Sequence, residues 1–244
     1  MDAHRVWAEV DLDALTHNLS RIRHRLTSRV AVMLVVKADA YGHGAVAVVH
    51  HALRCGVQAL GVGTSAEALE LRAAGVRAPI LVLGTIVDEE ATACLRHGVD
   101  IALHSLDRAH MLQELGHRLG SAARVHVKVD TGMGRLGVLP ERALDLLRAV
   151  QGSSHLVLRG LMTHVAAPQG ASAVEAIEQL NLFEAVLRQA RSRSLVSGWV
   201  HAANSACIFT GLGNGYDAVR PGISAYGVLP EGIAGCEELQ PVLS

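Results

Sequence analysis

Short apolar runs alternate along the chain with longer segments in which apolar residues recur at helical spacing. The runs that predict strands lie at residues 31–37, 58–63, 79–83, 99–103, 124–129, 156–163, 199–203 and 217–220. Between them lie helix start and stop signals: Ser65 precedes and Gly75 follows one predicted helix, and Pro140 begins another. Strands that alternate with helices in this way predict a closed (β/α)8 barrel, with an open doubly wound sheet as the alternative.

Both ends of the chain depart from this alternation. Residues 5–10 alternate as a short strand would, and Asp11 can cap a helix with Leu12, Leu15, Leu19 and Ile22 on one face. From about Gly227 the barrel pattern stops, and residues 239–244 resemble the beginning of a further strand. We therefore expect the barrel to end near residue 226.

Composition narrows the classes of protein. Hydrophobic residues make up 50% and aromatic residues 3%, which suits a sheet covered by helices. A formal charge of -1 provides no basic field for nucleic acid or an anionic membrane. The four cysteines show no metal-ligand spacing, and the first residues lack the apolar region of a signal peptide. These features predict a reduced, soluble, cytoplasmic protein.

The stretch from Val35 to Gly44 contains the first candidate for chemistry. Lys37 ends a continuous apolar run, so we expect its ammonium to have lost hydration, which favours a nucleophilic amine. Such an amine can form a Schiff base with an aldehyde. The alternative is a lysine whose ammonium reaches solvent or Asp39.

Other polar residues stand at or just after the ends of predicted strands, where barrels of this type hold their sites. Each has a purely structural alternative when taken singly, such as a hydrogen-bonded core histidine at position 164. Their shared placement favours one site. They are Tyr41, Lys128, Arg135, Thr163, His164, Asn204, Ser205, Arg220 and Gly222.

The segment Gly132–Gly137 matches the GxGxxG pattern of dinucleotide-binding loops. A dinucleotide site would also need an acid near the end of the next strand, and Thr163-His164-Val165 stands there instead. The glycines are better explained as a turn that directs Arg135 into the site.

Together these segments resemble the N-terminal barrel domain of bacterial alanine racemase, a fold-type III enzyme that uses pyridoxal 5'-phosphate (PLP). The similarity runs in order through nearly the whole chain. The matching segments are 7–11, 36–44, 130–137, 162–164, 203–205 and 219–227.

The resemblance implies a role for each residue. Lys37 would carry the cofactor and act as the base on one face of the substrate, and Arg135 would bind near the substrate carboxylate. Lys128 matches a lysine that is carbamylated in some members of the family. The remaining cofactor contacts would come from Tyr41, Ser205, Gly222 and Ile223 at the phosphate, with Asn204 nearby, and from Arg220 and His164 at the pyridine ring.

The family also carries a second, all-β domain whose tyrosine acts on the opposite face across a homodimer. The resemblance therefore implies a PLP barrel at 1–226 and the start of a second domain at 227–244, with little racemase activity from this part alone. The expected activity is interconversion of L- and D-alanine, which supplies D-alanine for peptidoglycan. A stand-alone PLP carrier and another fold-type III racemase or decarboxylase are the alternatives.

Overall fold

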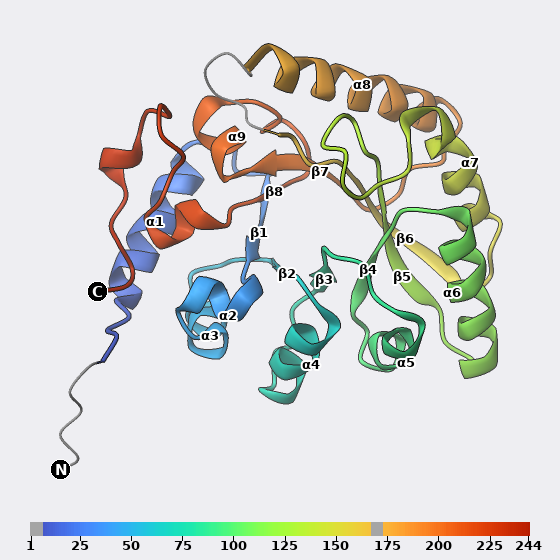
Figure 1. The fold of residues 1–244 in the computed structure, drawn as a ribbon, viewed down its shortest axis with the longest axis horizontal. Helices are drawn as coiled ribbons and strands as arrows, with labels where there is room; N and C mark the ends of the chain where they lie inside the picture. Colours follow the sequence, from blue (N-terminus) through green and yellow to red (C-terminus); the bar gives the residue numbers. More distant parts are fainter. Residues whose placement is uncertain (1–6, 167–172) are drawn as a thin grey trace.

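The computed structural model describes residues 7–166 and 173–244 and contains a closed barrel of eight parallel strands (Figure 1). The strands pair in sequence order, and β8 closes the barrel by pairing with β1. Their bounds are β1 (Ala31–Val35), β2 (Ala59–Val62), β3 (Ile80–Val82), β4 (Asp100–Leu103), β5 (Ala123–Lys128), β6 (Leu156–Met162), β7 (Trp199–Asn204) and β8 (Ala218–Arg220). The predicted (β/α)8 barrel is confirmed, and the open doubly wound sheet is wrong.

Helices surround the barrel and follow the strands in turn (Figure 1). Gly120 lies in the left-handed region at the end of α6, as expected for a helix-terminating glycine. The α-helices are α1 (Leu12–His24), α2 (Lys37–Gly42), α3 (Ala45–Arg54), α4 (Ser65–Ala73), α5 (Asp88–Arg96), α6 (Leu106–Leu119), α7 (Pro140–Gln151), α8 (Ala173–Ser192) and α9 (Ser205–Thr210). Within the described ranges, no helix is long and apolar enough to cross a membrane.

The strands bury both faces, which explains why they read as continuous apolar runs. Outward-facing residues such as Leu34, Leu60 and Ile101 pack with the helices in the main core. A separate, smaller cluster fills part of the barrel interior and consists of Met33, Ala59, Leu81, Ala102 and Met162. The core therefore lies in two layers, one between strands and helices and one inside the barrel.

The first described residues and the C-terminal segment lie together against the barrel. The C-terminal segment runs beside α1 (Figure 1), where Glu238 forms ion pairs with Arg21 and Arg25. The Glu9 N–H donates to the Ser244 carbonyl at 2.9 Å, and the Ser244 N–H returns a bond at 3.1 Å. The short 3-10 helices η2 (Ile223–Tyr226) and η3 (Cys236–Glu238) connect β8 to this segment.

This pairing corrects the prediction for residues 5–10. Residues 5 and 6 lie outside the described part of the chain, and Val10 forms an isolated antiparallel bridge with Leu243 rather than belonging to a strand. Residues 9–11 are instead paired with the chain's own residues 242–244. The predicted domain boundary at residue 226 stays a prediction.

Candidate active site

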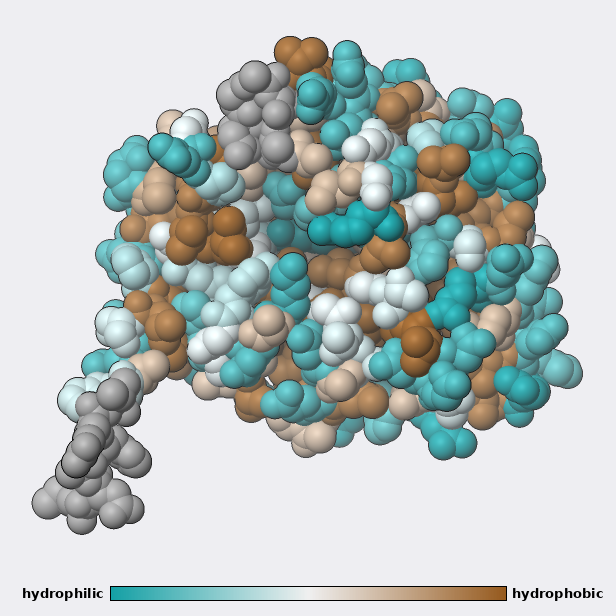
Figure 2. Space-filling view, in the orientation of Figure 1, coloured by the Kyte–Doolittle hydropathy of each residue, from teal (hydrophilic) through white to brown (hydrophobic). Residues whose placement is uncertain are grey.

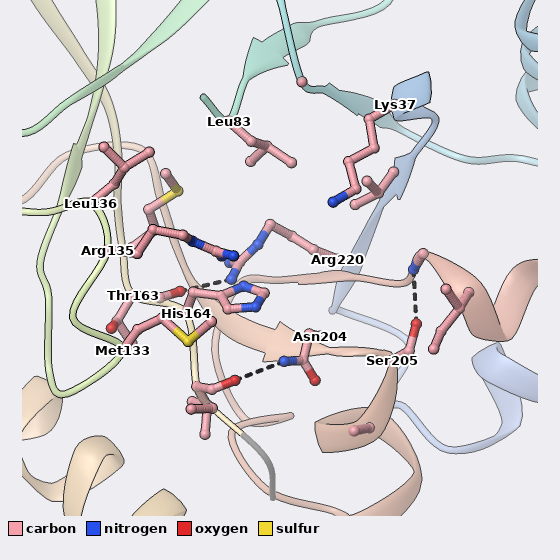
Figure 3. A pocket seen from close by; sticks show the side chains of 18 of the residues that line it. Lys37, Leu83, Met133, Arg135, Leu136, Thr163, His164, Asn204, Ser205 and Arg220 are labelled. Atoms are coloured by element: carbon pink, nitrogen blue, oxygen red, sulfur yellow. Dashed lines mark hydrogen bonds between the residues drawn. The ribbon is translucent and has the colours of Figure 1, made fainter. Parts of the chain in front are cut away.

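A cavity of about 620 Å³ opens at the carboxyl ends of the strands. In Figure 2 the surface is hollowed near the centre of the molecule, with hydrophilic and hydrophobic residues at its border. Every candidate residue named from the sequence lines this cavity: Lys37, Tyr41, Lys128, Arg135, Thr163, His164, Asn204, Ser205, Arg220, Gly222 and Ile223. Figure 3 shows Lys37 reaching in from one side and Arg135 from another, with Arg220 between them.

Lys37 is held by an unusual backbone turn that follows β1. The four residues from Ala38 to Tyr41 have φ between 52° and 55°, so this part of α2 is a left-handed turn made of non-glycine residues. Each such residue costs roughly 1–2 kcal/mol relative to the right-handed form. Glu67 holds the turn by accepting the Ala38 N–H at 2.8 Å, and Asp39 accepts the Ala45 N–H at 2.6 Å.

The expected burial of Lys37 at the end of a strand is wrong. Strand β1 ends at Val35, and the Lys37 side chain is exposed rather than buried at the strand end. Its ammonium lies 5.8 Å from the centre of the Tyr41 ring. Lys37 is therefore accessible to a ligand in the cavity, and burial does not explain its reactivity.

Hydroxyl groups and backbone N–H groups converge where α9 and η2 begin. The Ser205 Oγ accepts the N–H of Gly222 at 2.9 Å (Figure 3) and that of Ser224 at 3.2 Å, and the Ser224 hydroxyl lies 3.0 Å from it. A Cβ at Gly222 would lie 2.7 Å from the Tyr41 hydroxyl, so only glycine lets the two approach. Burial raises the pKa of Tyr41, so its hydroxyl stays a donor.

Asn204 lines the same end of the cavity, but backbone groups engage both ends of its amide. Its Oδ1 accepts the Cys207 N–H at 3.0 Å and so caps α9. Its Nδ2 donates to the Val165 carbonyl at 2.9 Å (Figure 3). These contacts indicate that Asn204 shapes the site.

Arg220 is buried at the end of β8 and has fixed partners. Its guanidinium donates to the carbonyls of Thr163 at 2.7 Å and Ala202 at 2.9 Å, and to His201 Nδ1 at 2.6 Å. Burial lowers the pKa of Arg220 to about 10, so the group stays protonated at neutral pH. Among the described residues, the imidazole that accepts from Arg220 is that of His201, and His164 makes no hydrogen bond to Arg220.

His164 nevertheless lies beside the guanidinium (Figure 3). Burial, and then the positive charges of Arg220, Lys128, Arg135 and Lys37, lower the pKa of His164 to about 3. The imidazole is therefore neutral and can stand next to a ligand without adding charge. His201 was not among the candidates named from the sequence. It lies two residues after Trp199, the first residue of a predicted strand, and a histidine at that place could have marked it.

The glycine-rich loop after β5 is built around Asp130. The carboxylate accepts the N–H groups of Gly132, Gly134 and Arg135, each at 3.1 Å. Burial alone would raise the pKa of Asp130, but these backbone N–H groups outweigh it and lower the pKa. A Cβ at Gly137 would clash with the Asp130 backbone. The loop thus brings Arg135 to the cavity, as the turn interpretation predicts.

The charged residues that line the cavity are all basic. Among the described residues, no Asp or Glu joins Lys37, Lys128, Arg135 and Arg220 in its wall. Burial, then Arg220 and Arg135, lower the pKa of Lys128 to about 8. The whole sequence contains only two lysines, and both lie here. The cavity is therefore suited to an anionic ligand and contains two amines that can act as nucleophiles.

The chain is similar in sequence to known proteins. The model of the family "Alanine racemase, N-terminal domain" matches residues 10–230. An alanine racemase of Methanococcus maripaludis is 36% identical over 100% of the chain and 66% of its own length, and one of Desulfovibrio desulfuricans is 38% identical over 92% and 61%. The chain thus spans less than two thirds of the length of these relatives.

Solved structures agree. Alanine racemase of Clostridium difficile 630 superposes with a TM-score of 0.94 at 32% identity, over 100% of this chain and 64% of that one. The Bacillus anthracis enzyme with bound L-Ala-P gives a TM-score of 0.91 at 32% identity, again over 100% and 64%. The chain belongs to the alanine racemase N-terminal domain family.

Proposed function

We propose that this chain is the PLP-binding barrel of an alanine racemase, which interconverts L- and D-alanine. The observation that carries the proposal is the pairing of an accessible lysine, Lys37, with a hydroxyl and N–H cradle at Ser205 and Gly222 in one basic cavity. Its volume of about 620 Å³ is in the range of small-molecule sites. A phosphate ester with an aldehyde and an amino-acid carboxylate would use all of these groups.

The described residues fit PLP at both of its ends. The hydroxyls of Ser205 and Tyr41 lie at the place where Gly222 leaves room for a phosphate. Ile223 begins η2 beside them. At the other end, Arg220 keeps its protons and lines the cavity with donors that His201, Thr163 and Ala202 do not engage.

Bound PLP supplies an electron sink that makes the α-proton of an amino acid acidic. In this proposal the Lys37 amine would hold the cofactor and, once the amino group of the substrate has replaced it, would move the α-proton on one face. Arg135 binds the substrate carboxylate as a charge-assisted partner. Because arginine cannot easily lose its proton, Arg220 would leave the pyridine nitrogen of a bound cofactor unprotonated, which would weaken the electron sink and favour racemisation over transamination.

Lys128 has the properties of a carbamylation site. Its lowered pKa of about 8 leaves part of the amine unprotonated near neutral pH, and that form attacks CO2 with release of a proton. The resulting anion would face Arg135 and Arg220 and offset their charge. A carbamate carbon signal in protein treated with ¹³CO2 that is absent from Lys128→Met supports this assignment; no signal in the wild type contradicts it.

Racemisation also needs an acid/base on the opposite face. Among the described tyrosines, Tyr216 donates to Glu184, and Tyr226 is buried and donates to the Val35 carbonyl. Tyr41 stands at the phosphate end. We propose that the second base comes from a further domain across a homodimer, in a cytoplasmic enzyme that makes D-alanine for peptidoglycan.

Exchange of the α-proton tests the proposal. The chain is loaded with PLP and incubated with L-alanine in D2O, with Lys37→Met as the control. We expect NMR to show α-deuteration in the wild type that exceeds formation of D-alanine, and none in the variant. PLP binding without exchange would favour the carrier, and faster exchange of another amino acid would favour a different fold-type III enzyme.

A further inference from the structure

Behind Arg220, a line of buried polar side chains crosses the barrel interior. His201 Nε2 lies 2.9 Å from His126 Nδ1, and His126 Nε2 lies 3.3 Å from Asp100 Oδ2. With the 2.6 Å bond between Arg220 and His201, these contacts join β8, β7, β5 and β4. All four residues are buried. The line runs from the cavity at the carboxyl ends of the strands to the amino end of β4.

The barrel makes room for this line. Strand β6 lies between β5 and β7, and it carries Gly160 where the two imidazoles meet. A Cβ at Gly160 would clash with His126 Nδ1. The β5–β6 register also shifts between Val125 and His126, as bulges do where a side chain is redirected.

The direction of the hydrogen bonds follows from the groups at the two ends. Arginine only donates, so His201 Nδ1 accepts and its proton lies on Nε2. That proton donates to His126 Nδ1, so the proton of His126 also lies on Nε2, facing a carboxylate that only accepts. Both imidazoles are therefore neutral and have the same tautomer. The accepting nitrogen is Nδ1 in both rings. A proton added there would face a second donor, the Arg220 guanidinium at His201 or the His201 Nε2–H at His126.

The far end of the line is anchored separately. Asp100 Oδ1 lies 2.7 Å from Arg124 Nε, which holds the carboxylate in place. Asp100 and His126 also line a second cavity of about 190 Å³ at the amino ends of the strands, with Arg159 and Trp199. The buried positive charge of Arg220 is thus linked through two neutral imidazoles to the negative charge of Asp100.

We propose that Asp100, His126 and His201 are positioning residues that fix the orientation of the Arg220 guanidinium toward the ligand in the main cavity. This inference rests on the proposed function for one point, the identity of the ligand as PLP. Three of the five guanidinium hydrogens are held by His201, Thr163 and Ala202. The hydrogen-bonded line Asp100–His126–His201, called the relay below, therefore determines where the remaining donors point.

The tautomers provide a test that needs no cofactor. Protein labelled with ¹⁵N-histidine is studied by NMR without PLP, and signals are assigned by single substitutions at His126 and His201. We expect both rings to be Nε2-protonated, with ring protons that exchange slowly. The exposed pair His117 and His155, whose ring nitrogens are 3.3 Å apart, serves as a fast-exchanging reference. An Nδ1-protonated ring at either buried position would overturn the relay.

Asp100→Asn then tests the positioning role, because it removes the charge and keeps the shape. We expect at least tenfold faster exchange of the His201 ring proton and about tenfold weaker PLP binding, as when an outer-shell partner is lost at a metal site. Asp88→Asn, at an exposed carboxylate paired with Arg108, is the matched control and should change neither.

The outcomes separate this inference from the proposed function. Unchanged exchange and unchanged PLP affinity in a folded Asp100→Asn protein would contradict the positioning role. If that variant fails to fold, the wild-type tautomers still decide whether the relay exists. If wild-type protein shows the predicted tautomers but binds no PLP at Lys37, the proposed function fails while the relay stands.

Discussion

The two halves of the barrel interior are built from opposite chemistry on the same backbone frame. On the side of β1 to β3, the inward residues Met33, Ala59 and Leu81 form an apolar cluster. On the side of β5 to β8, Met162 also belongs to this cluster, but four buried residues are polar or charged: His126, Lys128, His201 and Arg220. Hydrophobic burial is not directional, whereas each polar group needs a partner at a fixed distance.

The strand pairing differs accordingly. The pairs from β1 to β5 keep a regular register. Register shifts occur between Val125 and His126 and between His201 and Asn204, both on the polar side. Such irregularities redirect side chains and are frequent near active sites. The apolar half therefore keeps regular strand pairing and supports the barrel. In the polar half the strand register is irregular, and this irregularity accompanies the geometry of the site.

Substitution at the centre of the polar half should have the largest effect on stability. His201→Phe removes the acceptor of the Arg220 guanidinium and the donor to His126, leaving buried groups unpaired. We expect a loss of about 3–5 kcal/mol in the free energy of unfolding. Met33→Leu, equally buried in the apolar half, should cost less than about 1.5 kcal/mol. Urea denaturation measures both, and equal losses would contradict the comparison.

A smaller effect, on binding, is expected at the cradle. In Gly222→Ala the new methyl group would lie 2.7 Å from the Tyr41 hydroxyl and displace it. Overpacking of this kind costs about 1–3 kcal/mol, so PLP affinity should fall roughly tenfold to a hundredfold. Gly215→Ala is the control, because a Cβ there meets nothing within 4 Å. Titration with PLP followed by absorbance gives both constants; equal affinities would remove Tyr41 from the phosphate site.

The smallest effect should have the opposite sign. Lys128 has a pKa of about 8 in the folded chain against 10.5 in the unfolded chain, so the unfolded state holds more protons between these values. Burial of the charged Lys128 therefore lowers the free energy of unfolding by its full amount below pH 8. This loss disappears as the pH rises to 10.5. Lys128→Met should therefore stabilise the protein by about 1 kcal/mol at pH 7, after allowance for solvent screening.

Urea denaturation in CO2-free buffer at several pH values checks this, since carbamylation would change the charge. The difference between variant and wild type should close as the pH approaches 10.5. A Lys128→Met variant that is less stable than the wild type at pH 7 would contradict this prediction and show that the Lys128 side chain stabilises the folded protein.

Much of the fold was predictable because strands buried on both faces read as apolar runs. Lys37, just after β1, and Arg220, at the end of β8, likewise indicated which end of the barrel contains the cavity. The left-handed turn at residues 38–41 was not predictable, since Ala, Asp and Tyr give no local preference for it strong enough to read. The relay was missed because His126 and His201 lie inside strands, although the alternation His126-Val127-Lys128 put His126 on the face of a recognised site residue.

Pairing between residues 9–11 and 242–244 was beyond local pattern as well, because it joins opposite ends of the chain. The exposure of Lys37 also depends on where the backbone turns after Val35, which an apolar run does not specify. Periodicity predicts elements, whereas the partners of buried polar groups depend on contacts distant in sequence.

The most direct test of the account uses the chain's two lysines. The protein is incubated with PLP, reduced with borohydride, digested, and analysed by mass spectrometry to locate the pyridoxyl group. We predict modification at Lys37, with the Lys128 peptide unmodified, and loss of the adduct in Lys37→Met. Modification at Lys128 with Lys37 untouched would contradict the assignment of the cofactor lysine and the function built on it.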